Sequence, residues 1–385
     1  MTACGMPSQT NEIAASDTLS PSPEALPNTH REVAEGAGIF DVTVSPFLAE
    51  HSAAWTNYVA QAPAATVFHE LGWMAAVQDV YRHRPHYLVA RDATGSRTVG
   101  ILPLFEVRGP FTGLALISSP YAVNGGIIAD HPGAEGALML AAQSLARQLK
   151  VRYLEIRQPG GHLGLAEKSH HYAFRKTMSE SPSDVLSSFP RKARAAIRHA
   201  IDRHKLTTRF GPQLLGVFHR LYVASLRRLG SPPHSRRFFQ RLLQEYGDRC
   251  WIQIVYQADT PVAGVISLRF KDQILPYFAG IDEHYSRLNT SNFMYYSLME
   301  QAVTAGLRIF DFGRTRQDNV GGCEFKTNQG FEPEPLTYSF YSPSNVAPPD
   351  LRPSNRKFSL AQAVWRRLPL SSVSFVGGIV TRWLP

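Results

Sequence analysis

The 385-residue sequence has few of the features that mark secreted or membrane-spanning proteins. Its three cysteines, Cys4, Cys250 and Cys323, are odd in number and widely spaced, so they indicate no disulfide framework and fit a reducing compartment. No apolar run approaches the roughly 18–20 residues that span a bilayer. The N-terminus lacks the charged start and apolar core of a secretory signal. The sequence therefore predicts a cytoplasmic protein.

Residues that hold metals or act as nucleophiles are also sparse. Histidines occur at His83, His86 and His170–His171, but no cysteine or carboxylate follows at the spacing of a metal-ligand set. No neighbouring feature lowers the pKa of the Cys323 thiol, which favours a structural role for it. We therefore expect no metal site and no cysteine nucleophile.

Composition describes a globular protein that favours anionic partners. Hydrophobic residues make up 44% of the chain and charged residues 18%, and the length suffices for two domains with cores of their own. The net charge is +9 and the sequence pI is about 9.5. Nucleic acid, phosphorylated metabolites or an anionic membrane surface would suit that charge, and a basic solvated surface is the alternative.

The predicted elements occur twice in similar order: helices, then a series of strands, then a helix and a strand. This order favours an α/β (α+β) protein of two tandem modules, at 39–177 and 178–341, after a disordered tail at 1–38. Residues 342–385 are expected to form a linker and a short amphipathic segment. Expected helices lie at 46–61, 69–81, 134–150, 183–188, 191–204, 214–229, 237–246 and 291–305, and expected strands at 86–91, 98–106, 114–119, 151–156, 251–257, 262–270, 273–280 and 308–312.

The segment 306–331 concentrates unusual chemistry. A buried strand at 308–312 is expected to present Asp311 on the face opposite its aromatic residues, and Arg314 follows at its carboxyl end. A polar, glycine-rich connection then leads to an expected second strand that carries Phe325 and Lys326. A carboxylate and two cations at a strand edge indicate either a structural ion network or a site for an anionic substrate. The residues alone leave both interpretations open.

A second group of cations lies on the predicted helix at 191–204. Arg191, Arg194 and Arg198 are three to four residues apart and share a face. Such a row suits phosphate contacts with a nucleotide-linked substrate, a lipid carrier or an aminoacyl-tRNA. A solvated basic face is the alternative.

The motifs and the element order together resemble the FemA/FemB-type peptidoglycan-bridge transferases. The resemblance is strongest to the branch associated with PEP-CTERM/exosortase exopolysaccharide loci, and it covers most of residues 40–385. It rests on Phe310–Arg314, Glu324–Lys326, Gly330–Pro333, Phe189–Arg194, Ile101–Phe105, Gly125–Gly126 and the tail Trp365–Leu370. Gln329 departs from the family pattern, which has an aromatic residue there.

The resemblance implies two tandem GNAT-like acyltransferase domains, each with a mixed, mostly antiparallel twisted sheet flanked by helices. It implies N-acyl transfer by direct attack of an amine, on a cell-envelope or exopolysaccharide precursor, in a cleft of the C-terminal domain. Lys326 would stabilise the oxyanion, Asp311 would orient or deprotonate the amine, and Arg314 would fix Asp311 or a substrate phosphate. Apart from the resemblance, the residues themselves make Tyr277, Tyr285 and Asn124 further candidates for substrate binding. The alternatives are core packing for the two tyrosines and a plain hairpin turn for Asn124.

The acyl donor is left open between aminoacyl-tRNA and acyl-CoA, with no tightly bound cofactor. Enzymes of this fold that use acetyl-CoA hold its pyrophosphate on a glycine-rich turn before a helix. The corresponding segment, 285–292, contains no glycine; Asn289 and Ser291 can cap the helix but cannot supply a close glycine nest. This absence favours aminoacyl-tRNA or another carrier over CoA.

Two alternatives remain: an acyl-CoA-dependent N-acyltransferase, and a non-enzymatic module that binds an anionic ligand on the same fold. We expect a monomer. Its tail, through Trp365, Trp383 and nearby arginines, contacts either an anionic membrane or the protein's own surface.

Overall fold

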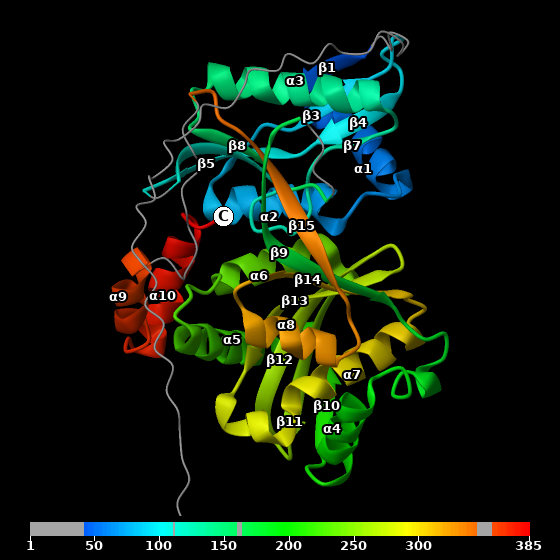
Figure 1. Ribbon diagram of the computed structural model, residues 1–385, viewed down its shortest axis with the longest axis vertical. Coiled ribbons are helices and arrows are strands. Elements are labelled where there is room, and N and C mark those ends of the chain that lie inside the picture. The colour runs from blue at the N-terminus through cyan, green and yellow to red at the C-terminus, as the bar shows by residue number, and fades with distance from the viewer. Residues whose placement is uncertain (1–41, 111, 160–163, 345–355) are drawn as a thin grey trace, which may run out of the picture. The chain divides into compact units, whose positions relative to one another are not determined.

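The computed structural model describes residues 42–110, 112–159, 164–344 and 356–385, the side chains of residues 356–360 excepted. The predicted tail at 1–38 and most of the predicted linker lie outside these residues. The mixed α/β prediction is confirmed: two sheets, one of four and one of eleven strands, are flanked by helices (Figure 1). No helix among the described residues combines the length and the apolar character that crossing a bilayer requires.

The first half contains nine strands and three α-helices within the described residues. They are β1 (Thr43–Pro46), α1 (Ser52–Gln61), α2 (Leu71–Tyr81), β2 (Arg84–Pro85), β3 (Leu88–Arg91), β4 (Thr98–Leu102), β5 (Leu104–Gly109), β6 (Gly113–Ser118), β7 (Ile128–Ala129), α3 (Pro132–Gln148), β8 (Tyr153–Ile156) and β9 (Ala166–Thr177).

The second half repeats the sequence of helices, strands, helix and strand. Its elements are α4 (Arg191–Asp202), β10 (Leu206–Phe210), α5 (Leu215–Leu229), α6 (Arg236–Tyr246), β11 (Cys250–Gln257), β12 (Thr260–Phe270), β13 (Gln273–Ile281), α7 (Thr290–Thr304), β14 (Ile309–Arg316), α8 (Val320–Asn328) and β15 (Pro333–Tyr341). Two further helices follow, α9 (Arg356–Trp365) and α10 (Leu370–Thr381).

Three predicted elements are wrong in extent or type because of prolines and short turns. The helix expected at 46–61 begins only at Ser52, since residues up to Pro46 form β1. The strand expected at 98–106 breaks at Pro103, which has no N–H to donate, and its two parts join different sheets. At 183–188 the chain forms only a 3-10 turn, Pro182–Asp184.

The eleven-stranded sheet crosses both halves, in the order β10-β11-β12-β13-β14-β9-β15-β8-β6-β5-β2. Each half places its last strand beside the other half. β9, from the first half, pairs antiparallel with β14, and β15, from the second half, pairs antiparallel with β8. β9 and β15 also pair with each other, so the halves share one hydrogen-bonded sheet (Figure 1). The division at 177/178 stays a prediction.

The core also joins the halves. The largest buried cluster combines Trp55 and Trp73 of the first half with Phe238, Phe239 and Phe278 of the second. A second cluster lies under α4 and α7, and a third under α3. Burial of aromatic side chains from both halves in one cluster makes independent movement of the halves costly.

Candidate active site

The two central strands of the second half separate after a short contact. β13 and β14 are parallel and pair only at Gln273↔Ile309 and Ile274↔Phe310. β13 continues to Ile281 and β14 to Arg316 without further pairing between them. The later residues of these strands are therefore free to line a cavity and to offer backbone groups to a ligand.

A bulge in β14 turns its side chains at the point of separation. Asp311 lies opposite Arg175 and Arg314 lies opposite Ala173, so two residues of β14 face a single residue of β9. The bulge includes Gly313, whose φ of 65° lies in the left-handed region that favours glycine. The Gly313 N–H donates to Asp311 Oδ1 at 2.7 Å.

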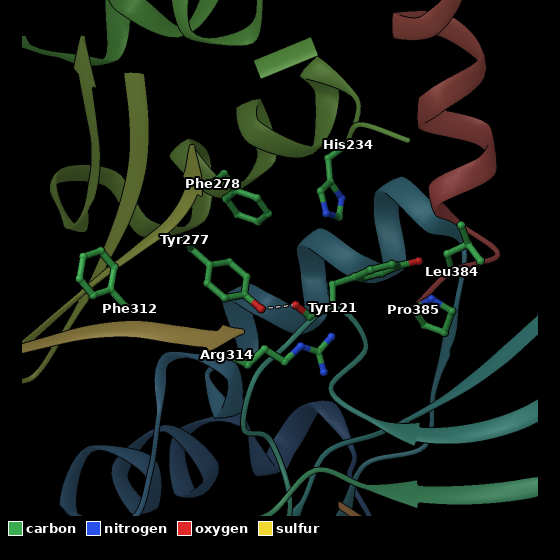
Figure 2. Close-up of a pocket in the computed structure, with 8 residues that line it drawn as sticks. All are labelled: Tyr121, His234, Tyr277, Phe278, Phe312, Arg314, Leu384 and Pro385. Carbon is green, nitrogen blue, oxygen red and sulfur yellow. Dashed lines mark hydrogen bonds between the residues drawn. The ribbon is translucent and has the colours of Figure 1, made fainter. Parts of the chain in front are cut away.

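A cavity of about 320 Å³ lies at this separation. β13 contributes Tyr277 and Phe278, and β14 contributes Phe312 and Arg314. The other lining residues are Tyr121, His234, Leu384 and Pro385 (Figure 2). The Tyr277 hydroxyl donates to the Tyr121 carbonyl oxygen, as the dashed line in Figure 2 marks. The cavity thus has aromatic walls and one permanent cation.

Arg314 has a hydrogen-bond partner but no anionic one. Its Nη1 donates to the Tyr338 hydroxyl at 2.9 Å, and its guanidinium lies 5.7 Å from the centroid of the Tyr338 ring. Among the described residues, no ion pair joins Arg314 to a carboxylate, Asp311 included. Burial opposes its charge, but the neighbouring Tyr338, Tyr277 and Glu155 hold its pKa above the ordinary value. A charged arginine without a counter-ion is suited to an anionic ligand.

The surroundings of Tyr338 carry an excess of positive charge. Arg157 also lies over the Tyr338 ring, at 5.8 Å, and is itself paired with Glu155. Burial and the nearby charges of Arg314 and Arg157 lower the pKa of His171 to about 3. His171 is therefore neutral at physiological pH. Because Arg157 is paired with Glu155, Arg314 is the charged group near Tyr338 that has no ion-pair partner.

Lys326 lies on a helix, so the predicted second strand is wrong. Asn319 begins α8, because its side chain accepts from the Gly322 N–H at 3.1 Å and caps the first turn. Near the other end of α8, Lys326 Nζ donates to the Phe312 carbonyl oxygen at 2.9 Å. Nζ also lies 5.1 Å from the centroid of the Phe312 ring, which lines the cavity.

Burial and the charge of each group shift the pKa values of both Lys326 and Asp311. Lys326 is half-buried, and burial lowers its pKa to about 8, although the negative charge of Asp311 opposes the shift. Burial raises the pKa of Asp311, against the Gly313 hydrogen bond and the charges of Arg175 and Lys326. The two groups therefore interact electrostatically. No ion pair within 4.0 Å joins them among the described residues.

The other predicted substrate residues lie apart from the lining of this cavity. Arg191 and Arg198 are exposed on α4, and Arg194 donates to the Ser187 carbonyl oxygen at 3.2 Å. Tyr285 packs on the core beneath α7. The Asn124 carbonyl oxygen accepts from Thr66 Oγ1 at 3.0 Å, while Asn124 Oδ1 is buried without a partner among the described residues. Of the predicted binding residues, the structure brings together Tyr277 and Arg314.

Sequence reasoning missed three residues around this cavity: His234, Arg157 and Tyr338. His234 is half-buried, its Nδ1 shares a hydrogen bond with the Tyr81 hydroxyl, and burial lowers its pKa to about 3. No local motif marks His234 or Tyr338. The sequence does mark Arg157, because it lies two residues after Glu155 much as Arg314 lies three residues after Asp311.

The helix after the predicted donor turn starts differently from the expectation. Residues Glu283–Leu288 form a 3-10 helix that leads directly into α7 at Thr290. Asn289 occupies the capping position in a left-handed conformation, but its side chain makes no capping hydrogen bond, so the predicted cap is wrong. Thr290 Oγ1 instead donates to the Tyr285 carbonyl oxygen at 2.6 Å.

Gln329 replaces an aromatic residue inside the fold. It is 1% exposed, and its Oε1 has no hydrogen-bond partner among the described residues. Within the same residues, no three His, Cys, Asp or Glu side chains lie close enough to hold a metal ion.

Part of the chain matches a known protein family. Residues 187–327 match the model of a family described as acetyltransferase (GNAT) domain. That range holds Asp311, Arg314 and Lys326. The comparison with curated proteins found no match.

Solved structures resemble about three quarters of the chain in fold. A crystal structure of FemX shares 14% identity over 78% of this chain and 97% of its own, with a TM-score of 0.61. A tandem GNAT protein from the clavulanic acid biosynthesis pathway shares 13% over 78% and 98%, with a TM-score of 0.52. The C-terminal domain of a putative lysylphosphatidylglycerol synthetase from Agrobacterium fabrum shares 12% over 77% and 93%, with a TM-score of 0.52.

These similarities confirm the predicted fold class, two tandem GNAT-like domains. At such low identity they show the fold alone. The match at 187–327 adds that the half with the separated strands is the one with GNAT-type sequence.

Proposed function

We propose that this protein is a Fem-type N-acyltransferase that transfers an aminoacyl or acyl group to an amine of a cell-envelope or exopolysaccharide precursor. The observation that carries the proposal is the separation of β13 and β14, within the GNAT-matching range, into a cavity lined by Arg314. Resemblance to the exosortase-associated branch supports the envelope acceptor.

Lys326 would act as a cation at the reacting carbonyl. A lysine with a pKa of about 8 stays mostly protonated at pH 7. Its bond to Phe312 O leaves two further N–H donors on Nζ, available to an oxyanion. Half-burial strengthens such an interaction because water screens it less.

The reaction then needs no covalent nucleophile. The acceptor nitrogen attacks the donor carbonyl carbon and forms a C–N bond, and the ester C–O bond of an aminoacyl-tRNA or the thioester C–S bond of an acyl-CoA breaks. The amine proton passes to the departing oxygen or sulfur. Asp311, whose pKa is raised by burial, would accept the amine proton or orient the amine.

Arg314 would bind an anionic group of the substrate in the cavity, and Tyr277 would form part of the wall. Arg191, Arg194 and Arg198 on α4 would contact the phosphates of a carrier. In a GNAT domain acyl-CoA is a substrate, not a tightly bound cofactor. The absence of glycine before α7 favours aminoacyl-tRNA as the donor, and acyl-CoA is the second candidate.

The test is a transfer assay with both donors. Purified protein receives aminoacyl-tRNA or acetyl-CoA together with an envelope-precursor extract, and mass spectrometry follows the acyl mass added to amine-bearing glycans. We expect addition from one donor. An absence of transfer from either donor, together with salt-sensitive binding of an anionic carrier, would favour the non-enzymatic binding module instead.

A further inference from the structure

The C-terminal helix α10 docks onto the protein through one narrow face. Val373, Gly377 and Thr381 are buried and recur every four residues. Gly377 allows close approach, since a Cβ there would meet the ring of Pro233 at 2.4 Å. Thr381 Oγ1 donates to the Pro233 carbonyl oxygen at 3.0 Å. The segment between Pro232 and Ser235 therefore holds α10 in place.

The opposite face of α10 is apolar and exposed. Phe375 is 75% exposed, Ile379 46% and Val376 38%. Leu229 at the end of α5 and Val364 on α9 are each 52% exposed, and a Cβ on Gly230 would meet the α9 residue Gln362 at 3.2 Å. Few other large apolar side chains of the described residues are this exposed. A gathering of such residues marks a surface that contacts another body.

The charge around this face has one sign. Residues 356–385 contain Arg356, Lys357, Arg366, Arg367 and Arg382 and no acidic residue. Arg366 and Arg367, on the turn between α9 and α10, are exposed. An acidic neighbour from another element, Glu283, is paired with Arg228 at 3.0 Å. An apolar helix face bordered by arginines suits an anionic lipid surface, where the apolar side chains enter the acyl boundary and the arginines meet headgroups.

We infer that the outward face of α10 binds the surface of an anionic bilayer. The residues that contact the membrane differ from those expected from the sequence. Trp365 and Trp383 are half-buried against the protein. The exposed apolar side chains that would enter the bilayer are Phe375, Val376 and Ile379. The phosphates of a nucleic acid would pair with the arginines but would not bury the apolar side chains.

Membrane binding would also bring the cavity to the bilayer. The chain leaves α10 at Thr381, and Leu384 and Pro385 line the cavity beside Arg314 (Figure 2). Arg157 Nη2 donates to the Pro385 carbonyl oxygen at 3.2 Å, and the Tyr121 hydroxyl donates to the Arg382 carbonyl oxygen at 3.4 Å. An acceptor on a lipid carrier would then reach the cavity without leaving the membrane. This last consequence rests on the proposed function, whereas the membrane binding does not.

The test is co-sedimentation of the full chain with vesicles, without donor or acceptor. We expect binding to phosphatidylcholine vesicles that contain about 30% phosphatidylglycerol, and little binding to phosphatidylcholine alone. The double variant Phe375→Ser, Ile379→Ser should bind about tenfold more weakly or worse. Leu140→Ser is the matched control, because Leu140 is 66% exposed on α3, and it should bind like the wild type.

A second variant tests the charges independently of the helix packing. Arg366→Gln with Arg367→Gln should weaken binding about 25-fold at low salt. Lys150→Gln with Arg152→Gln, an exposed basic pair in the first half, should leave binding unchanged. Failure of the wild type to bind anionic vesicles, or binding at the wild-type level by both double variants of the C-terminal segment, would overturn the inference. A dimer in light scattering that Phe375→Ser, Ile379→Ser dissolves would overturn it in favour of contact between copies.

Discussion

The two halves build the same strand pair and use it differently. In the first half β6 and β8 are parallel and pair through Ala115↔Tyr153, Leu116↔Leu154 and Ile117↔Glu155, close to the ends of both strands. In the second half β13 and β14 separate after two pairs. The first arrangement closes the sheet, and the second opens a cavity.

A single extra residue accompanies this difference. Both halves have an acidic residue, an apolar residue and an arginine at this point of the second strand. The first half reads Glu155-Ile156-Arg157, and the second reads Asp311-Phe312-Gly313-Arg314, with Gly313 as the additional residue. Without the addition, Arg157 Nε and Glu155 Oε1 form an ion pair at 2.7 Å. With it, Asp311 accepts from Gly313 and Arg314 turns to Tyr338. The bulge therefore separates an acid and an arginine that form a direct ion pair in the first half.

The largest expected effect comes from breaking the closed pair. Arg157→Gln leaves Glu155, 9% exposed, without its cation, and should lower the free energy of unfolding by about 3–5 kcal/mol. Urea unfolding measures this. Arg152→Gln, an exposed arginine nearby, serves as the control and should change stability by less than about 0.5 kcal/mol. A loss below about 1 kcal/mol in Arg157→Gln would contradict a structural role for the pair.

Removal of the corresponding arginine in the second half, where the strands separate, should affect substrate binding instead of stability. Arg314→Gln should raise KM for the anionic substrate roughly 10- to 150-fold, the range of a hydrogen bond to a charged group. Its thermal stability should stay equal or rise, because an arginine without a counter-ion is removed. Equal loss of stability in Arg314→Gln and Arg157→Gln would remove the distinction between the halves.

Disturbing the bulge itself should have a smaller effect on stability. Gly313→Ala places a Cβ 3.2 Å from Val123 Cγ2, on a residue with φ of 65°. We expect a loss of about 1–2 kcal/mol together with slower transfer. Gly321→Ala in α8 is the control, since nothing lies within 4 Å of its added Cβ, and it should be neutral or slightly stabilising. Unchanged transfer in Gly313→Ala would make the bulge incidental.

A pH profile offers the mildest test. If the Lys326 ammonium is the active form, the rate should fall as pH rises through about 8. Between pH 8 and its ordinary pKa of 10.5, the unfolded chain binds this proton and the folded chain does not, so this residue makes stability rise with pH. Unfolding through Lys326 therefore cannot explain the decline. Lys326→Arg should move the decline in rate to higher pH. A decline at the same pH in this variant would show that another group causes it.

The sequence predicted the helices and central strands of the second half closely because their apolar periodicity is strong. α5, α6, β11, β13 and α7 begin and end within about one residue of the expected bounds. β9 and β15 were missed because their stability comes from pairing with strands far away in sequence, which local patterns do not record.

The candidate site was predicted in composition but not in geometry. Asp311, Arg314 and Lys326 were expected to converge as one group. The bulge instead directs Arg314 into the cavity with Tyr277, while Lys326 reaches Phe312 from a helix. The glycines at 321 and 322 suggested a loop, but the Asn319 cap and the contacts of α8 with β14 stabilise a helix. Arg157 is the first-half counterpart of Arg314 in sequence, because each follows an acidic residue by two or three positions.

The most direct test compares two lysines in the transfer assay. Lys326 and Lys176 are both half-buried, both lie over aromatic rings, and burial lowers the pKa of both. Lys326→Ala should reduce the rate of transfer about 10²- to 10³-fold, the effect of losing an oxyanion donor, while circular dichroism stays unchanged. Lys176→Ala should transfer at nearly the wild-type rate. Wild-type activity in folded Lys326→Ala, or equal losses in both variants, would contradict the proposed catalytic role.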